Sequence, residues 1–150
     1  MSTKKIIILV VLLAAAGAGI YAWKEYNRKN EDLSGVKALH TVQAVALINE
    51  FNSNDSLANS KYLGKVVAVE GMVKQVDRDD EGKYTVVLGD TAEMSSVRCL
   101  MDSLHASDAT ALARGESVKI KGSFNGFKKD DTGLLGSDVE LNRCVIEKNK

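Results

Sequence analysis

The stretch "KVVAVEGMVKQV", Lys65–Val76, contains the residues that decide the fold. It is rich in β-branched residues, which favour β-strands. Gly71 lies in its middle, and a glycine inside a strand pattern marks a bulge or a sharp bend. A small closed barrel needs such a bend in its first strand, so that one strand can serve two sheets. The stretch therefore predicts a bent first strand of a small β-barrel.

Further strand patterns follow at short intervals. "DRDDEG" (Asp77–Gly82) is a turn by composition. "SLHASDATALARGE" (Ser103–Glu116) reads as helical or coiled and ends near Gly115, a plausible helix C-cap. Four more runs have strand composition: residues 83–90, 96–102, 117–127 and 138–148.

A helical region precedes the strands. In "TVQAVALINEFNSND" (Thr41–Asp55) the apolar residues follow a largely helical spacing. We expect an amphipathic helix over roughly Thr41–Asn52, with Thr41 as its N-cap. A second short helical turn fits "SLANSKYLG" (Ser56–Gly64).

The predicted order is a helix, three strands, a short helix and two strands. Five strands with a helix between the third and fourth is the connectivity of the OB-fold, a Greek-key barrel. An SH3-like barrel and an open α+β sheet are the alternatives. The expected core and flanking contacts are Val66, Val67, Val69, Val73, Val86, Leu88, Val97, Val118, Ile120, Val139, Leu141 and Ile146.

The N-terminal region differs from the rest in composition. Residues 1–5 are short and basic, and residues 6–23, Ile6 to Trp23, carry no charge. Eighteen helical residues span roughly 27 Å, close to the thickness of a bilayer's hydrocarbon core. We predict a single-pass transmembrane signal-anchor at 6–23, a polar tether at 24–40 and an OB-fold domain at 41–150. A cleaved signal peptide is the alternative for the apolar run.

The same segment predicts a location. A signal-anchor of this kind places the chain in the bacterial cytoplasmic (inner) membrane, with the soluble domain on the periplasmic or extracytoplasmic side. Lys4 and Lys5 favour an N-terminus inside, whereas Lys24, Arg28 and Lys29 partly oppose it.

The two cysteines, Cys99 and Cys144, fall in the third and fifth predicted strands. Those strands are neighbours in an OB barrel, so the side chains are expected to lie side by side. In an oxidising compartment this predicts a disulfide. Two reduced core residues or a reactive thiol are the alternatives.

No metal site or catalytic set is predicted. His40 and His105 are the only imidazoles, and neither has ligand spacing to a cysteine. "DRDDEG" and "KKDDTG" do not match a calcium-binding loop. We expect no cofactor, no metal and no enzymatic activity.

Candidate ligand residues lie in the loop that joins the last two strands. OB-folds bind along their second and third strands and through the adjoining loops. Phe124 and Phe127 next to Lys128 and Lys129 could stack on bases or sugars. The alternative is that both aromatic rings pack the end of the barrel and the lysines are solvated.

The charge balance argues against nucleic acid. The chain has 20 basic and 20 acidic residues, and 18 basic residues remain when Lys4 and Lys5 are set aside. We expect a membrane-tethered, extracytoplasmic OB-fold binding module for a protein, a glycan or a small envelope ligand. Its second partner is the lipid bilayer, through the N-terminal helix. The alternative is a cytoplasm-facing OB domain that binds single-stranded nucleic acid.

Several motifs resemble one bacterial family. "NSKYLGKVVAVEGMVKQV" (Asn59–Val76), "RGESVKIKGSFNGF" (Arg114–Phe127), and the cysteines within "VRCLM" and "DVELNRCVI" are similar to the tRNA_anti-like group of OB-fold proteins. The resemblance covers about Thr41 to Ile146. It implies an OB-fold, often with an N-terminal anchor or lipoprotein signal, and no assigned catalytic residues. The chain has Phe124 where members often carry a further cysteine, and the family name is not evidence of tRNA binding.

Overall fold

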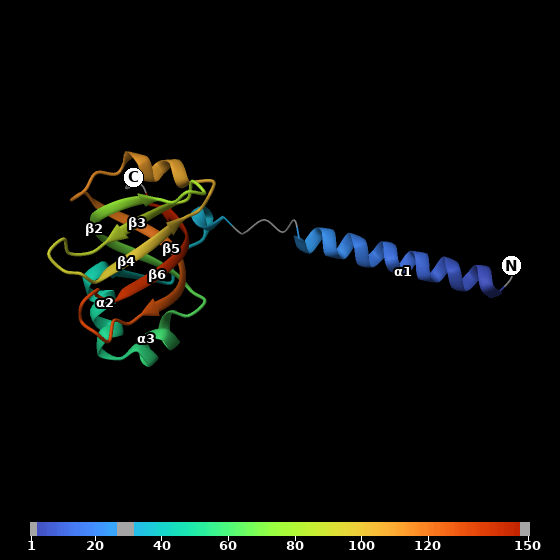
Figure 1. The fold of residues 1–150 in the computed structure, drawn as a ribbon, viewed down its shortest axis with the longest axis horizontal. Helices are drawn as coiled ribbons and strands as arrows, with labels where there is room; N and C mark the ends of the chain where they lie inside the picture. Colours follow the sequence, from blue (N-terminus) through green and yellow to red (C-terminus); the bar gives the residue numbers. More distant parts are fainter. Residues whose placement is uncertain (1–2, 27–31, 148–150) are drawn as a thin grey trace. The chain divides into compact units, whose positions relative to one another are not determined.

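The structure is a computed structural model that describes residues 3–26 and 32–147 (Figure 1). The chain forms two compact units, residues 1–31 and residues 32–150, and each is described by itself. The first unit is a single helix, α1 (Thr3–Tyr26), and the second is a small β-barrel with short helices.

Helix α1 includes residues 6–23, where the sequence predicts a signal-anchor. The structure bears out the helical conformation alone. Within the described ranges, no helix has the length and apolar character that crossing a bilayer requires. The side chains of residues 6–9, 11 and 12 lie outside the described part of the chain.

The barrel has five strands: β2 (Val66–Arg78), β3 (Tyr84–Leu88), β4 (Ser96–Met101), β5 (Ser117–Lys128) and β6 (Asp138–Ile146). They pair in the order β2-β3-β4-β6-β5, and β5 pairs with β2 to close the barrel. The β4–β6 pair is parallel and the other barrel pairs are antiparallel. The predicted mainly β, five-stranded closed barrel is therefore confirmed.

Strand β2 changes partners near Gly71. Residues 66–72 pair with β5, and pairing with β3 begins at Val73, opposite Leu88. A Cβ atom on Gly71 would lie 2.8 Å from the Cβ of Ala44, closer than two carbon atoms can approach. The change of partner at Gly71 agrees with the bend predicted there, and glycine at this position also lets Ala44 of α2 pack directly on it.

The predicted helix at Thr41–Asn52 is partly wrong. His40–Gln43 forms a strand, β1, parallel to the first half of β2, and helix α2 (Ala44–Ser53) begins only after it. Gln43, not Thr41, occupies the N-cap position, without a side-chain capping bond. The unpaired edge of β2 offers backbone partners, starting with Leu39 N donating to the Val66 carbonyl at 2.9 Å. Residues 40–43 therefore form strand hydrogen bonds in place of the helical turn that the apolar spacing predicts.

The shorter helices follow the sequence more closely. Helix α3 (Asp55–Tyr62) is capped by the Asn54 side chain, which accepts from Leu57 N at 3.1 Å. Between β4 and β5 lies the 3₁₀ helix η2 (Ala106–Ala111), where a helical or coiled segment is predicted.

The prediction that residues 24–40 form a tether is wrong for the second half of this range, which packs on the barrel. Residues 27–31 lie outside the described part, but a 3₁₀ turn η1 (Leu33–Gly35) packs on the barrel with Leu33 buried. Lys121 Nζ donates to the Ser34 carbonyl at 3.2 Å, and His105 Nε2 lies 3.1 Å from Asp32 Oδ1. The domain therefore begins at about Asp32.

The core fills the barrel and the space beneath α2. Nine of the twelve expected core residues are buried, and Val118 and Ile146 pack against the core from its edge. At the α2 end, the Phe51 ring stacks on Phe124 with centroids 5.2 Å apart and on Phe127 at 4.9 Å. This aromatic cluster attaches the helix to the barrel.

We predict that Phe124→Ala destabilises the domain by about 3–5 kcal/mol, because it removes a buried ring from the cluster. Leu134→Ala is the matched control, since Leu134 is 71% exposed, and should change stability by less than about 0.5 kcal/mol. Urea unfolding of the two variants measures both values. Equal midpoints for them would contradict this role of Phe124.

Candidate functional site

The face formed by β3 and β4 is the usual ligand face of an OB-fold. Its arginine, Arg98 on β4, lies between two carboxylates, with its guanidinium 3.6 Å from Asp77 Oδ2 and 3.7 Å from Asp138 Oδ2. Two anions beside one cation leave this part of the face with no net positive charge. The arrangement does not suit a phosphate backbone, which needs unneutralised lysine or arginine.

The loop between β2 and β3 is closed by its own side chains. Asp79 Oδ1 accepts from Glu81 N at 3.0 Å and from Lys83 N at 2.8 Å, and Lys83 pairs with Glu81. The Arg78 guanidinium lies over the Tyr84 ring, 5.6 Å from its centroid. The aromatic ring at this loop is therefore already engaged by a cation.

The loop between β5 and β6 is organised by Asp130. Its carboxylate accepts from Thr132, from Leu135 N at 2.7 Å and from Gly136 N at 3.1 Å. These hydrogen bonds, led by the one from the Thr132 hydroxyl, hold the pKa of Asp130 well below its usual range. The Asp130 carboxylate therefore holds the loop in its conformation.

Across residues 3–26 and 32–147, no group of three His, Cys, Asp or Glu residues is placed to hold a metal ion.

The four predicted ligand residues do not form one surface. Phe124 is 4% exposed, and Phe127 is partly buried against the core with its ring stacked on Phe51. Lys128 Nζ lies 2.5 Å from Glu140 Oε1, and Lys129 Nζ lies 3.8 Å from Asp131 Oδ1. The aromatic rings thus follow the alternative reading, packing the end of the barrel. The cause is Phe51, which the sequence could not place against them.

The two cysteines are brought together, as the strand order predicts. Cys99 and Cys144 are both buried, and they are free thiols, so the predicted disulfide is not formed in the structure. Burial raises the pKa of the Cys144 thiol, and its hydrogen bond with Cys99 raises it further. Two protonated thiols in contact inside the core are unreactive until the barrel opens.

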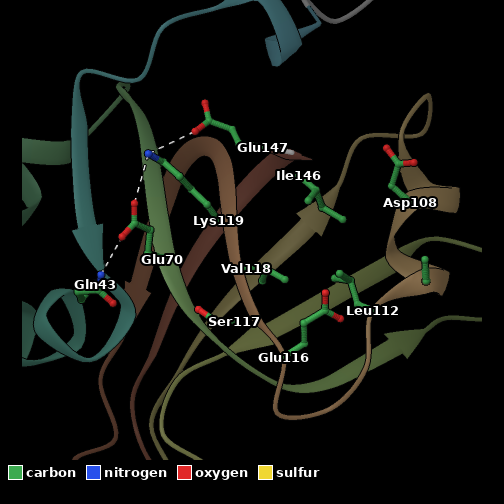
Figure 2. Close-up of a pocket in the computed structure, with 11 residues that line it drawn as sticks. Gln43, Glu70, Asp108, Leu112, Glu116, Ser117, Val118, Lys119, Ile146 and Glu147 are labelled. Atoms are coloured by element: carbon green, nitrogen blue, oxygen red, sulfur yellow. Dashed lines mark hydrogen bonds and ion pairs between the residues drawn. The ribbon is translucent and has the colours of Figure 1, made fainter. Parts of the chain in front are cut away.

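A cavity of about 500 Å³ lies on another side of the barrel, beside η2 (Figure 2). Lys119 on β5 lies between Glu70, at 3.3 Å, and Glu147, at 3.5 Å. Gln43 Nε2 donates to Glu70 Oε2 at 2.8 Å. Figure 2 shows this polar row on one side of the cavity and Asp108 of η2 on the other.

The floor of the cavity is apolar. Leu112, Val118 and Ile146 line it between the polar row and η2, and all three pack on the core (Figure 2). The Glu70 carboxylate, as the main cause, raises the pKa of Lys119, which keeps that ammonium paired within the row. Sequence reasoning missed this site because its residues come from β1, β2, η2, β5 and β6. The one sequence signal is the polar and apolar alternation in "SVKIK" (Ser117–Lys121).

The family model for tRNA_anti-like proteins matches residues 1–138. The chain belongs to the tRNA_anti-like family. A comparison with proteins of curated function gives no match.

Solved structures of other proteins are similar to this chain to different degrees, and the first described shares its fold. A candidate nucleic acid-binding lipoprotein from Klebsiella pneumoniae is 23% identical with a TM-score of 0.55, over 81% of this chain and 100% of that one. The asparaginyl-tRNA synthetase of Entamoeba histolytica, in complex with asparaginyl-adenylate, is 16% identical with a TM-score of 0.39, over 58% of this chain and 22% of the synthetase. The asparaginyl-tRNA synthetase from Pyrococcus horikoshii is 20% identical with a TM-score of 0.38, over 60% of this chain and 21% of the synthetase. The family member therefore spans only about a fifth of each synthetase.

We predict that the two thiols resist a maleimide in the folded chain and react after unfolding, because both are buried. Cys99→Ala is the control, since it should leave a single thiol to label in denaturant. Labelling of either thiol in the folded chain would contradict the prediction.

Proposed function

We propose that this family member is a membrane-tethered, extracytoplasmic OB-fold binding module for a protein, a glycan or a small envelope ligand. The observation that carries the proposal is the charge pairing of Arg98 on the β3–β4 face. Arg98 lies between the carboxylates of Asp77 and Asp138, and Lys128, on the neighbouring strand pair β5–β6, is paired with Glu140. A face of this kind binds ligands without a phosphate backbone better than it binds nucleic acid.

The absence of a stacking platform supports the same conclusion. Proteins that bind single strands use exposed aromatic rings next to cations. Here Phe124 and Phe127 pack beneath α2, and the Tyr84 ring is covered by Arg78. The alternative, binding of single-stranded nucleic acid, is favoured by the similarity in fold to the Klebsiella protein, which is described as a candidate nucleic acid-binding lipoprotein.

The tether is proposed from the sequence. Residues 6–23 contain no charged side chain, and they are flanked by Lys4 and Lys5 before and Lys24 after. An anchor of this kind leaves the domain to recruit a partner close to a membrane surface. The proposal assigns the domain no catalytic step.

We predict that a fluorescent single-stranded oligonucleotide shows no binding to the chain at about 50 mM salt, where phosphate contacts are strongest. Fluorescence anisotropy with DNA and RNA 20-mers measures it. The matched variant Asp77→Asn with Asp138→Asn releases Arg98 and should bind more than the wild type. Wild-type binding that weakens steeply as salt rises would overturn the proposed function.

A further inference from the structure

Three adjoining cavities, which together are called the groove, lie beside η2, beside the start of α2 and beside the loop between β3 and β4. The 500 Å³ cavity shares Gln43, Glu70 and Ser117 with a second cavity of about 260 Å³. The second shares Val45 and Asp90 with a third of about 280 Å³. The three cavities together make an elongated surface feature, longer than a compact small-molecule pocket.

The sides of the groove are strongly acidic. Among the described residues that line it, one side chain is a lysine, and six carry carboxylates: Glu70, Asp90, Glu93, Asp108, Glu116 and Glu147. Lys119 is shared between Glu70 and Glu147, and Lys121, beside the lining, also pairs with Glu147 at 3.3 Å. Burial lowers the pKa of Lys74, which lies near Asp90 and Glu93, and the charges of these two acids oppose that shift. Six carboxylates therefore face three lysines, an acidic excess in a chain whose overall charge is zero.

The floor of the groove is apolar along its length. Leu112, Val118 and Ile146 form it at the η2 end. Val45 and Met72 continue it in the second cavity, where they are 46% and 44% exposed. Apolar side chains left half-exposed in a concave surface favour a ligand that covers them.

We propose that this groove docks a lysine- or arginine-rich segment of a partner protein, with apolar residues interspersed among the basic ones. The inference rests on the proposed function and specifies its partner. Charge complementarity selects the occupant, since basic side chains can lay their alkyl stems on the floor and direct their cationic heads to the carboxylate rim. The same rim repels a nucleic acid, and an uncharged glycan has no cation to pair with the carboxylates of the rim.

The probe is a fluorescent ten-residue peptide in which lysine alternates with valine, measured by anisotropy with the full chain. We expect it to bind at about 50 mM salt and to weaken at least tenfold by about 500 mM, because exposed charges are screened. The same peptide with glutamate in place of lysine should not bind. Failure of the lysine peptide to bind would overturn the inference.

Two variant pairs locate the binding. Glu70→Gln with Glu116→Gln removes two charges from the rim and should weaken the lysine peptide about tenfold. Glu81→Gln with Asp131→Asn changes the net charge equally outside the groove and should leave the affinity unchanged. Met72→Ser should weaken binding severalfold, whereas Leu134→Ser, at an exposed leucine outside the groove, should not. Equal affinities for the members of either pair would overturn the inference.

Competition by spermine distinguishes binding in a groove with an apolar floor from binding to a purely ionic surface. A polyamine carries the charge without the apolar residues, so it should compete at least tenfold less well than the peptide. Equal competition would overturn the inference. Oligonucleotide binding by the wild type would overturn the proposed function itself, whereas loss of peptide binding with no oligonucleotide binding would overturn only the choice of partner.

Discussion

The change of partner along β2 is the constraint on which the rest of the domain depends. One strand serves both halves of the barrel because it bends where it leaves β5 and joins β3. Gly71 at the bend admits Ala44 to a distance that a side chain would block. The start of α2, the β1 strand that precedes it and part of the groove all lie next to this contact.

The barrel surface has two regions that differ in charge and therefore in the ligands that they can bind. On the β3–β4 face, Arg98 is paired with Asp77 and Asp138, and that part of the face has no net attraction for phosphate. Along the groove, six carboxylates face three lysines, Lys74, Lys119 and Lys121. This difference in charge is the reason for proposing a basic partner for the groove.

Local sequence patterns predicted the structure correctly where it depends on residues that are close together in the chain. Strand composition located all five barrel strands, and Asn54 could have been recognised as the cap of α3 from its residue type. The pattern failed at Thr41–Gln43, since the free edge of β2 recruits those residues into a strand. It also left the destination of Phe124 open, because Phe51 comes from a helix more than seventy residues earlier.

The sequence by itself located the five strands and the glycine where the first strand changes partners, because β-branched composition and a central glycine act over a few neighbouring residues. It also predicted that residues 6–23 form a helix and that Cys99 and Cys144 lie on neighbouring strands. Only the tertiary structure decided how the strands pair, which charges cancel and which accumulate. Arg98 meets Asp77 and Asp138 across the sheet, and the groove gathers its acids from β2, η2, the β3–β4 loop and the residues that flank β5 and β6. Electrostatic interaction depends on distance in space, which the order of residues along the chain does not specify.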